Sequence, residues 1–286
     1  MSTSVTQLIG SFYDRLGADV RAGLTAPATV DWYRWQLAKL TAVAGDVAAA
    51  ELRPRHIVSL RMTHHLARGI KRLFTWAVEE DFLEKNWFTK LRVPRCGRRK
   101  RIFTAAEIIR LYRSAPPSFR VILFFLLNTA ARPGEIRTLR WSDVDLEKRL
   151  ICLGNFKAKD RRADELETRS IPLSHVVCRR LERMKRAAVS GTVFNSDRTG
   201  KPYSYNALRC LMRRTREKAG LLDGGEKAVL YTLRHTAATI LLRQGVDLMT
   251  LSRILGHTTL EMTKRYLHLD DSDLIKAIDK ASQSGT

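Results

Sequence analysis

The stretch RCGRRKRIFTAAE, residues 95–107, divides this chain of 286 residues into two parts. Five of its first seven residues are basic, and like charges at this density repel one another, so we predict that residues 95–101 are exposed, within a basic linker over residues 95–103. Thr104 and Glu107 then form the pattern of a capping box at a helix N-terminus. We therefore expect one domain over residues 1–94 and a second over residues 104–286.

The residues before the linker predict a bundle of helices. Both APATVDWYRWQLAKLTAVAG (26–45) and RHIVSLRMTHHLARGIKRLFTWAVEEDFL (55–83) carry apolar residues at helical spacing, as at Leu66, Ile70 and Leu73. Helices of this kind bury their apolar stripes against one another.

The residues after the linker predict a mostly helical domain with a small β-sheet. VILFFLLNTAA (121–131) has the composition of a buried helix, and RLICL (149–153) and TRSIPL (168–173) have that of two strands joined by a long polar tip. Further helices are expected after Ser204, ending near Gly220, and over residues 232–245. The predicted fold class is mainly α with a small β-sheet.

The charge of the chain indicates an anionic polymer as partner. Fifty-one Lys and Arg residues against 29 Asp and Glu give a formal net charge of +22 and a pI of about 10.4. Nucleic acid is the first expectation. The competing partner is an anionic membrane surface, but no apolar run approaches the roughly 20 residues of a spanning helix, and the first 17 residues do not resemble a signal peptide. We expect a cytoplasmic protein.

No pattern in the sequence indicates a metal or a cofactor. The four cysteines are scattered without zinc or redox spacing, and we interpret them as isolated small hydrophobic residues. Neither glycine-rich phosphate-binding pattern, GxxxxGK[ST] or GxGxxG, occurs.

Two arginines stand where their charge is costly without an anionic partner. Arg132, in TAARPGEIRTLRW (129–141), directly follows the predicted buried helix, and Arg234, in YTLRHTAAT (231–239), lies among apolar and small residues. Arg132 either pairs with Glu135 or another internal carboxylate, or binds an external anion. Arg234 is either satisfied by backbone carbonyls or binds a phosphate near a helix N-terminus.

Two further residues are uninformative on their own. Lys157, on the predicted hairpin tip, has the place of a solvated surface lysine. Tyr266, in LGHTTLEMTKRYLHL (255–269), follows His257 by nine residues and by itself is typical of a half-buried aromatic residue.

Taken together, these residues indicate phosphoryl transfer. Two arginines can each hold phosphate oxygens through paired hydrogen bonds. A tyrosine can attack phosphorus if nearby positive charge favours its ionised form, and a lysine or histidine can protonate the departing 5′ oxygen. This chemistry requires no metal.

These motifs resemble those of the tyrosine recombinases, the family of phage integrases and Xer-type recombinases. AARPGEIRTLRWSDVD is similar to the family's first-arginine box, TLRHTAAT to its second, and LGHTTLEMTKRYLHL to the box with the last histidine and the nucleophile. The resemblance implies an N-terminal helical core-binding domain and an α+β catalytic domain. It also implies that Arg132 and Arg234 clamp the scissile phosphate, His257 hydrogen-bonds it, Tyr266 forms a 3′-phosphotyrosyl link, and Lys157 protonates the 5′ oxygen.

One position departs from the family pattern. The family often has a histidine three residues before the second arginine, whereas this chain has Tyr231, which we interpret as a hydrogen-bonding substitute. His235 lies on the other side of Arg234 in sequence and is interpreted as structural. Glu135 corresponds to the family's acidic support residue, and Lys159 is the alternative to Lys157.

The resemblance implies double-stranded DNA as partner, a tetramer on paired sites, accessory directionality factors as further candidates, no cofactor, and a phage or mobile-element role at the bacterial nucleoid. The candidate DNA contacts are Arg98, Arg99, Lys100, Arg101, Arg209, Arg213 and Arg216. In the tail, Leu274, Ile275 and Ile278 share one helical face that packs either on its own domain or on a neighbouring subunit. Two other functions stay open, a DNA-binding regulator without catalysis and a type IB topoisomerase-like enzyme.

Overall fold

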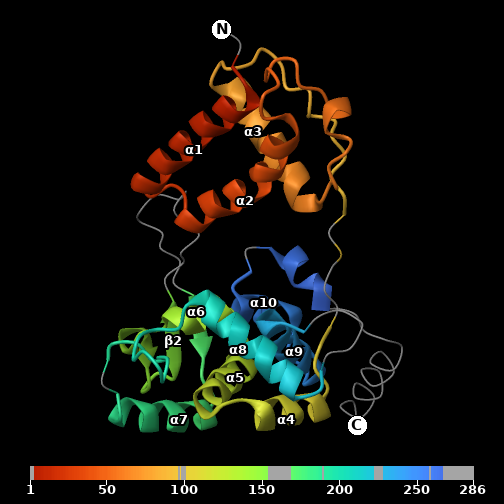
Figure 1. Cartoon of the computed structure of the whole chain (residues 1–286). Coiled ribbons are helices and arrows are strands. Elements are labelled where there is room, and N and C mark those ends of the chain that lie inside the picture. The colour runs from red at the N-terminus through yellow and green to blue at the C-terminus, as the bar shows by residue number, and fades with distance from the viewer. Residues whose placement is uncertain are drawn as a thin grey trace. The chain divides into compact units, whose positions relative to one another are not determined.

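The computed structural model describes residues 3–95, 97, 101–153, 169–188, 190–221, 228–257 and 259–266. Its chain forms two compact units, whose described residues lie before residue 98 and from residue 101 onward (Figure 1). The domain boundaries expected at residues 94 and 104 stay a prediction. Among the described residues, no helix combines the length and apolar composition needed to cross a bilayer.

The first unit is helical, as predicted. Its elements are α1 (Val5–Arg21), α2 (Pro27–Ala44), the short 3-10 helix η1 (Pro54–Ile57) and α3 (His64–Glu79). The three α-helices contact one another pairwise around a core that includes Phe12, Leu37 and Phe74. The N-terminus of α1 is closed by Ser4, whose side chain accepts a hydrogen bond from the Gln7 amide.

The second unit is mostly helical with a three-stranded antiparallel sheet in its described part, which confirms the predicted fold class. Its helices are α4 (Ala105–Ser114), α5 (Pro117–Thr129), α6 (Pro133–Thr138), α7 (His175–Arg186), α8 (Tyr205–Lys218), α9 (Leu230–Arg243) and α10 (Leu248–Leu255), with the 3-10 helices η2 (Trp141–Asp143), η3 (Leu260–Met262) and η4 (Lys264–Tyr266). Within this unit α6 and α10 lie toward one end and α4 and α7 toward the other (Figure 1).

The sheet contains the two predicted strands and one that the sequence did not indicate. β2 (Leu150–Leu153) pairs with β3 (Arg169–Pro172), and the additional β1 (Val144–Asp145) pairs with β2 on its other side. β1 is only two residues long, too short for an alternating pattern to be detected.

The buried helix α5 lies at the centre of the second unit and packs against α9. It ends at Thr129, and Ala130 follows in the left-handed conformation with φ 50°. After this reversal of the chain, Arg132 lies beside the C-terminal end of α10, where its Nη2 donates to the Gly256 carbonyl.

The last residues of the predicted basic linker pack against the second unit. Phe103, inside the predicted linker, is buried, and its amide donates to the Thr236 hydroxyl at 2.9 Å. Arg101 forms an ion pair with Glu107, which also accepts from the Thr104 amide in the predicted capping box. Burial of the apolar Phe103 side chain is favourable, although a run of charged residues directly precedes it in the sequence.

The cysteines only partly match their interpretation. Cys178 is buried, whereas Cys152 and Cys210 are exposed, and all three are free thiols. Cys152 alternates outward on β2, between the inward-facing Ile151 and Leu153.

Candidate active site

Arg132 is held between a carboxylate and a backbone carbonyl. Its Nη1 donates to Glu135 Oε1 at 2.7 Å and its Nη2 donates to the Gly256 carbonyl at 2.8 Å. The Arg132 side chain keeps 30% of its surface exposed. The sequence left pairing with Glu135 and binding of an anion as alternatives, and this geometry permits both.

Arg234, on α9, is almost completely buried, with 1% of its surface exposed. Its Nη1 donates to the Ala130 carbonyl at 2.9 Å and its Nη2 to the Leu255 carbonyl at 2.6 Å. Burial, together with the charges of Arg169 and Arg132, lowers the pKa of Arg234 to about 10. An anion at this guanidinium would offset both effects.

A third arginine, Arg169 on β3, belongs to the same cluster and was not predicted from the sequence. Its Nη1 forms an ion pair with Glu135, and its Nε donates to the Ile254 carbonyl at 3.0 Å. The signal was the strand alternation, because Arg169 and Ile171 both face inward on β3. A charged residue on the buried face of a strand requires a partner there.

The three arginines bind three successive carbonyls at the end of α10. We call Arg132, Arg169 and Arg234 the arginine clamp. Arg169 binds the carbonyl of Ile254, Arg234 that of Leu255 and Arg132 that of Gly256. The last carbonyls of a helix have no partner within the helix and carry partial negative charge. The clamp therefore fixes the chain immediately before His257.

Glu135 is the counter-charge of the clamp. It accepts hydrogen bonds from the Arg132 amide and from both the Arg132 and Arg169 guanidiniums. Burial raises the pKa of Glu135, but Arg169 and the hydrogen bonds from Arg132 outweigh it, so that the pKa lies below its ordinary value. Three guanidiniums against this one carboxylate leave two positive charges within the cluster.

His257 lies beside Arg234 and Tyr266. Its Nε2 is 3.4 Å from Arg234 Nη2, and its Nδ1 is 2.7 Å from the Thr263 hydroxyl oxygen. Since a guanidinium only donates, Nε2 accepts and Nδ1 carries the proton toward Thr263. The rings of His257 and Tyr266 are nearly parallel, at 7°, with centroids 6.3 Å apart.

Tyr266 is the last residue of the short helix η4, which packs against α9. The tyrosine itself is 9% exposed. Its hydroxyl oxygen is 3.1 Å from His235 Nδ1. His235, which the sequence analysis interpreted as structural, therefore contacts the candidate nucleophile. Residues 234 and 235 differ by about 100° around the helix, so Arg234 can bind the end of α10 while His235 meets η4.

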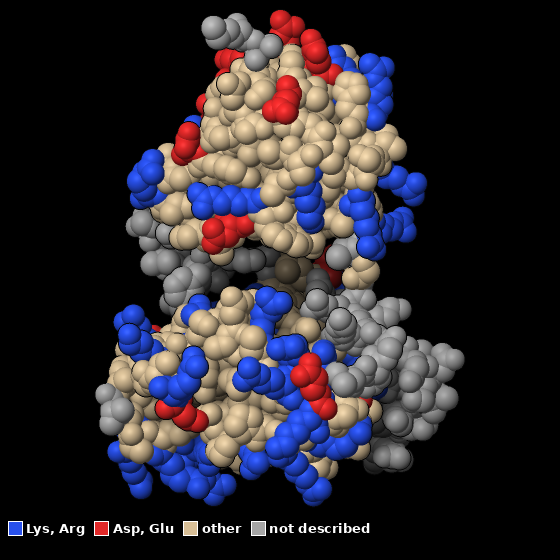
Figure 2. Space-filling view, in the orientation of Figure 1, with Lys and Arg blue, Asp and Glu red and all other residues tan. Residues whose placement is uncertain are grey.

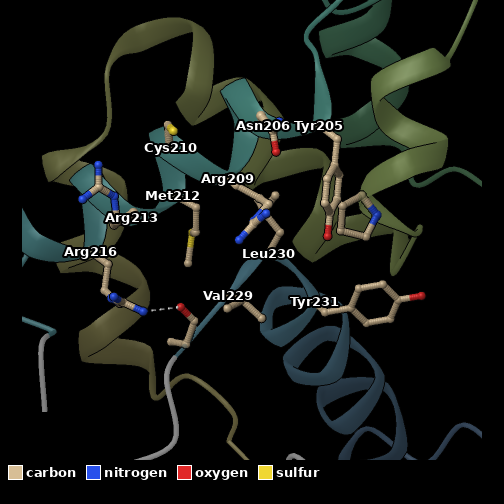
Figure 3. Close-up of a pocket in the computed structure, with 12 residues that line it drawn as sticks. Tyr205, Asn206, Arg209, Cys210, Met212, Arg213, Arg216, Val229, Leu230 and Tyr231 are labelled. Atoms are coloured by element: carbon tan, nitrogen blue, oxygen red, sulfur yellow. Dashed lines mark hydrogen bonds between the residues drawn. The ribbon is translucent and has the colours of Figure 1, made fainter. Parts of the chain in front are cut away.

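Tyr231 is at the edge of this cluster and 40% exposed. Its ring centroid is 6.1 Å from that of His235, one helical turn further along α9. Tyr231 also lines a pocket of about 540 Å³ between α8 and the start of α9 (Figure 3).

The basic residues that were predicted to contact DNA and that the structure describes fall into two groups. Arg209, Arg213 and Arg216 all line the pocket on α8, where Arg216 also donates to the Ala228 carbonyl at 2.9 Å (Figure 3). Arg101 instead pairs with Glu107 in the second unit. In the face shown in Figure 2, basic side chains greatly outnumber acidic ones on the second unit.

Several predicted residues lie outside the described parts of the chain. They are Arg98, Arg99, Lys100, Lys157, Lys159, Leu274, Ile275 and Ile278. Within the described residues, no group of three or more His, Cys, Asp or Glu side chains is arranged to hold a metal ion.

Residues 99–273 match the model of the phage integrase family. A tyrosine recombinase XerA from Thermococcus kodakarensis is 27% identical over 279 residues, which cover 90% of each chain. In fold, the chain is similar to a lambda integrase dimer bound to a COC′ core site, with a TM-score of 0.75 and 16% identity over 94% of this chain and 98% of that one.

A second similar structure is a lambda integrase tetramer bound to a Holliday junction. Its TM-score is 0.71, with 17% identity, and the match covers 92% of this chain and 79% of that one. The family match extends over more than half of the chain and includes the arginine clamp, His257 and Tyr266. The chain therefore belongs to the phage integrase family of tyrosine recombinases.

Proposed function

We propose that this protein is a site-specific DNA recombinase in which Tyr266 attacks the scissile phosphate and forms a 3′-phosphotyrosyl intermediate. The observation that carries the proposal is the convergence of Arg132, Arg234, His257 and Tyr266 from three separate stretches of the sequence. Such an arrangement combines a nucleophile with fixed positive charge for the phosphate oxygens.

In this mechanism the guanidiniums of Arg132 and Arg234 bind the non-bridging phosphate oxygens. The remaining exposed surface of Arg132 and the two net positive charges of the cluster support that role. His257 donates a hydrogen bond to a phosphate oxygen from Nε2, which requires that its contact with Arg234 rearranges and that Nε2 carries a proton. Lys157 is the proposed acid for the departing 5′ oxygen, on the family resemblance.

Each transfer exchanges one phosphate ester for another, so the bond energy is kept in the protein link and no nucleotide cofactor is required. Rejoining reverses the step with a 5′ hydroxyl as nucleophile. The similarity in fold to the lambda integrase tetramer on a Holliday junction supports four copies acting on two paired sites. A phage or other mobile element is the proposed biological context.

The test is a covalent trapping assay. Nicked duplexes prepared from the DNA that flanks the gene would be incubated with the protein, and the denatured products examined for a protein–DNA adduct. We expect an adduct with the unaltered protein and none with Tyr266→Phe, which lacks the nucleophilic oxygen. An adduct formed by Tyr266→Phe would overturn the assignment, and its loss in Tyr231→Phe alone would transfer the role to Tyr231.

A second assay separates recombination from topoisomerase activity. A plasmid with two target sites is expected to yield recombinant products. Relaxation of supercoils without exchange between sites would instead favour the topoisomerase-like function.

A further inference from the structure

The Tyr266 hydroxyl, the proposed nucleophile, contacts the imidazole of His235, to which the family resemblance gave no catalytic role. His235 Nδ1 is 3.1 Å from the Tyr266 oxygen, and the two ring centroids are 5.4 Å apart at 48°. This contact joins α9 to η4 across 31 residues of sequence. The distance is that of a hydrogen bond, so a proton can pass directly between the two groups.

The other aromatic side chains near the nucleophile are less suited to accept its proton. Tyr231, at the position where the family often has histidine, is 40% exposed, and a phenol is a weak base at neutral pH. The two ring nitrogens of His257 face Thr263 and Arg234, and its ring lies parallel to that of Tyr266. His235 directs a ring nitrogen at the Tyr266 oxygen itself.

A base is needed here because the free phenol is a poor nucleophile. With a reference pKa of about 10, roughly one phenol in 10³ is ionised at pH 7, whereas a free imidazole, with a pKa of about 6.5, is mostly neutral and able to accept a proton. The arginine clamp stabilises charge on the phosphate, but guanidiniums cannot accept protons.

We propose that His235 is the general base for Tyr266. His235 lies one helical turn after residue 231, where the family often has a histidine, and this inference rests on the proposed function. As the Tyr266 oxygen bonds to phosphorus, its proton moves to His235 Nδ1. The bond from phosphorus to the 5′ oxygen breaks, and that oxygen takes a proton from the separate acid. In rejoining, a 5′ hydroxyl attacks phosphorus and returns its proton to the separate acid, the phosphotyrosyl bond breaks, and His235 returns its proton to Tyr266.

The informative variant is His235→Asn. The asparagine amide lies near the position of Nδ1 and can hydrogen-bond the hydroxyl, but it cannot take up a proton. We expect single-turnover adduct formation on bound DNA to slow on the order of 10²-fold at pH 7. The rate of the variant should rise about tenfold per pH unit toward the phenol pKa, whereas that of the unaltered protein levels off above the imidazole pKa.

The matched control is His175→Asn, at the start of α7, where the imidazole bonds Arg149 in the same unit. It should retain the rate and pH profile of the unaltered protein. If His235→Asn also retains both, His235 is not the base. A hundredfold loss in Tyr231→Phe with none in His235→Asn likewise overturns the proposal in favour of Tyr231.

A measurement without DNA tests the contact directly. In ¹⁵N-labelled protein, Tyr266→Phe should shift the Nδ1 resonance of His235, and the same change at Tyr203, buried elsewhere in the unit, should leave it unmoved. An unchanged resonance in Tyr266→Phe overturns the inference. An adduct formed by Tyr266→Phe would instead overturn the proposed function, so the two failures are distinguishable.

Discussion

At the scale of single residues, Gly256 contacts two arginines of the clamp: its carbonyl accepts from Arg132, and its Cα lies against the Arg169 side chain. Its φ of 60° lies in the left-handed region, and a Cβ there would collide with the side chain of Arg169. Arg169 cannot easily withdraw, because its guanidinium is bound to Glu135 and to the Ile254 carbonyl. Glycine at this position is therefore required by both conformation and space.

We predict that Gly256→Ala destabilises the protein and slows adduct formation, because it displaces Arg169 and the chain before His257. The left-handed backbone alone costs about 1–2 kcal/mol for alanine, and the collision adds about 1–3 kcal/mol. The control is Gly220→Ala, since Gly220 has a φ of 66° and nothing within 4 Å of an added Cβ. Chemical denaturation compares the two, and equal losses would show that the contact with Arg169 has no energetic effect.

We predict that Glu135 makes the stability of the folded protein sensitive to acid. Because its pKa in the folded protein is below the ordinary value, its stabilising contribution is present above about pH 4.3 and is lost as the pH falls through the folded value. The unfolding free energy of the unaltered protein should therefore fall more steeply between pH 5 and 3 than that of Glu135→Gln.

At neutral pH, Glu135→Gln measures how much the Glu135 carboxylate contributes to the free energy of unfolding. Glu135→Gln leaves the buried Arg169 without its carboxylate, and breaking a buried pair in this way costs about 3–5 kcal/mol. If the unfolding free energies of the unaltered protein and of Glu135→Gln changed with pH in parallel, the assigned role of Glu135 would be contradicted.

At the scale of elements, α8 presents basic side chains on two different sides. Arg209, Arg213 and Arg216 line the pocket beside Tyr231, whereas Arg214 and Lys218 line a separate hollow against α4 and α5. Residues 209 and 213 are one turn apart, and residue 214 is displaced from residue 213 by about 100°. The two sides can therefore be tested independently.

We predict that the double change Arg209→Gln and Arg213→Gln weakens DNA binding and lowers the slope of log K against log salt. Each phosphate contact removed should reduce the magnitude of that slope by about 0.9. The matched control is Arg214→Gln with Lys218→Gln, which removes the same charge from the other side of α8. An equal effect of both pairs in a binding titration would show that only total charge matters.

The elements also show which predictions depend on local sequence. The capped starts of α4 at Thr104 and α8 at Ser204 were predicted correctly, because a cap involves only residues three positions apart. β1 and the buried position of Phe103 were not predicted. Both depend on partners elsewhere in the chain, Ile151 on β2 and Thr236 on α9.

At the scale of the whole molecule, the excess of basic residues predicts strong and salt-sensitive DNA binding. With a net charge of +22, the protein should neutralise many phosphates at once. If six to ten phosphates are contacted, the affinity for duplex DNA should fall about 10³- to 10⁵-fold between 50 and 200 mM salt. A slope near zero in fluorescence anisotropy would contradict an electrostatic interface.

The sequence by itself determined the helical first unit, the mixed second unit, the family, and the segments that hold Arg132, Arg234, His257 and Tyr266. These follow from periodicity, caps and motif spacing, which are properties of neighbouring residues. Only the tertiary structure decided that Arg169 shares Glu135 with Arg132 and that His235 meets Tyr266. The physical reason is sequence separation. His235 and Tyr266 are 31 residues apart, and Arg169 and Glu135 are 34 residues apart, so only tertiary packing brings each pair within hydrogen-bond distance.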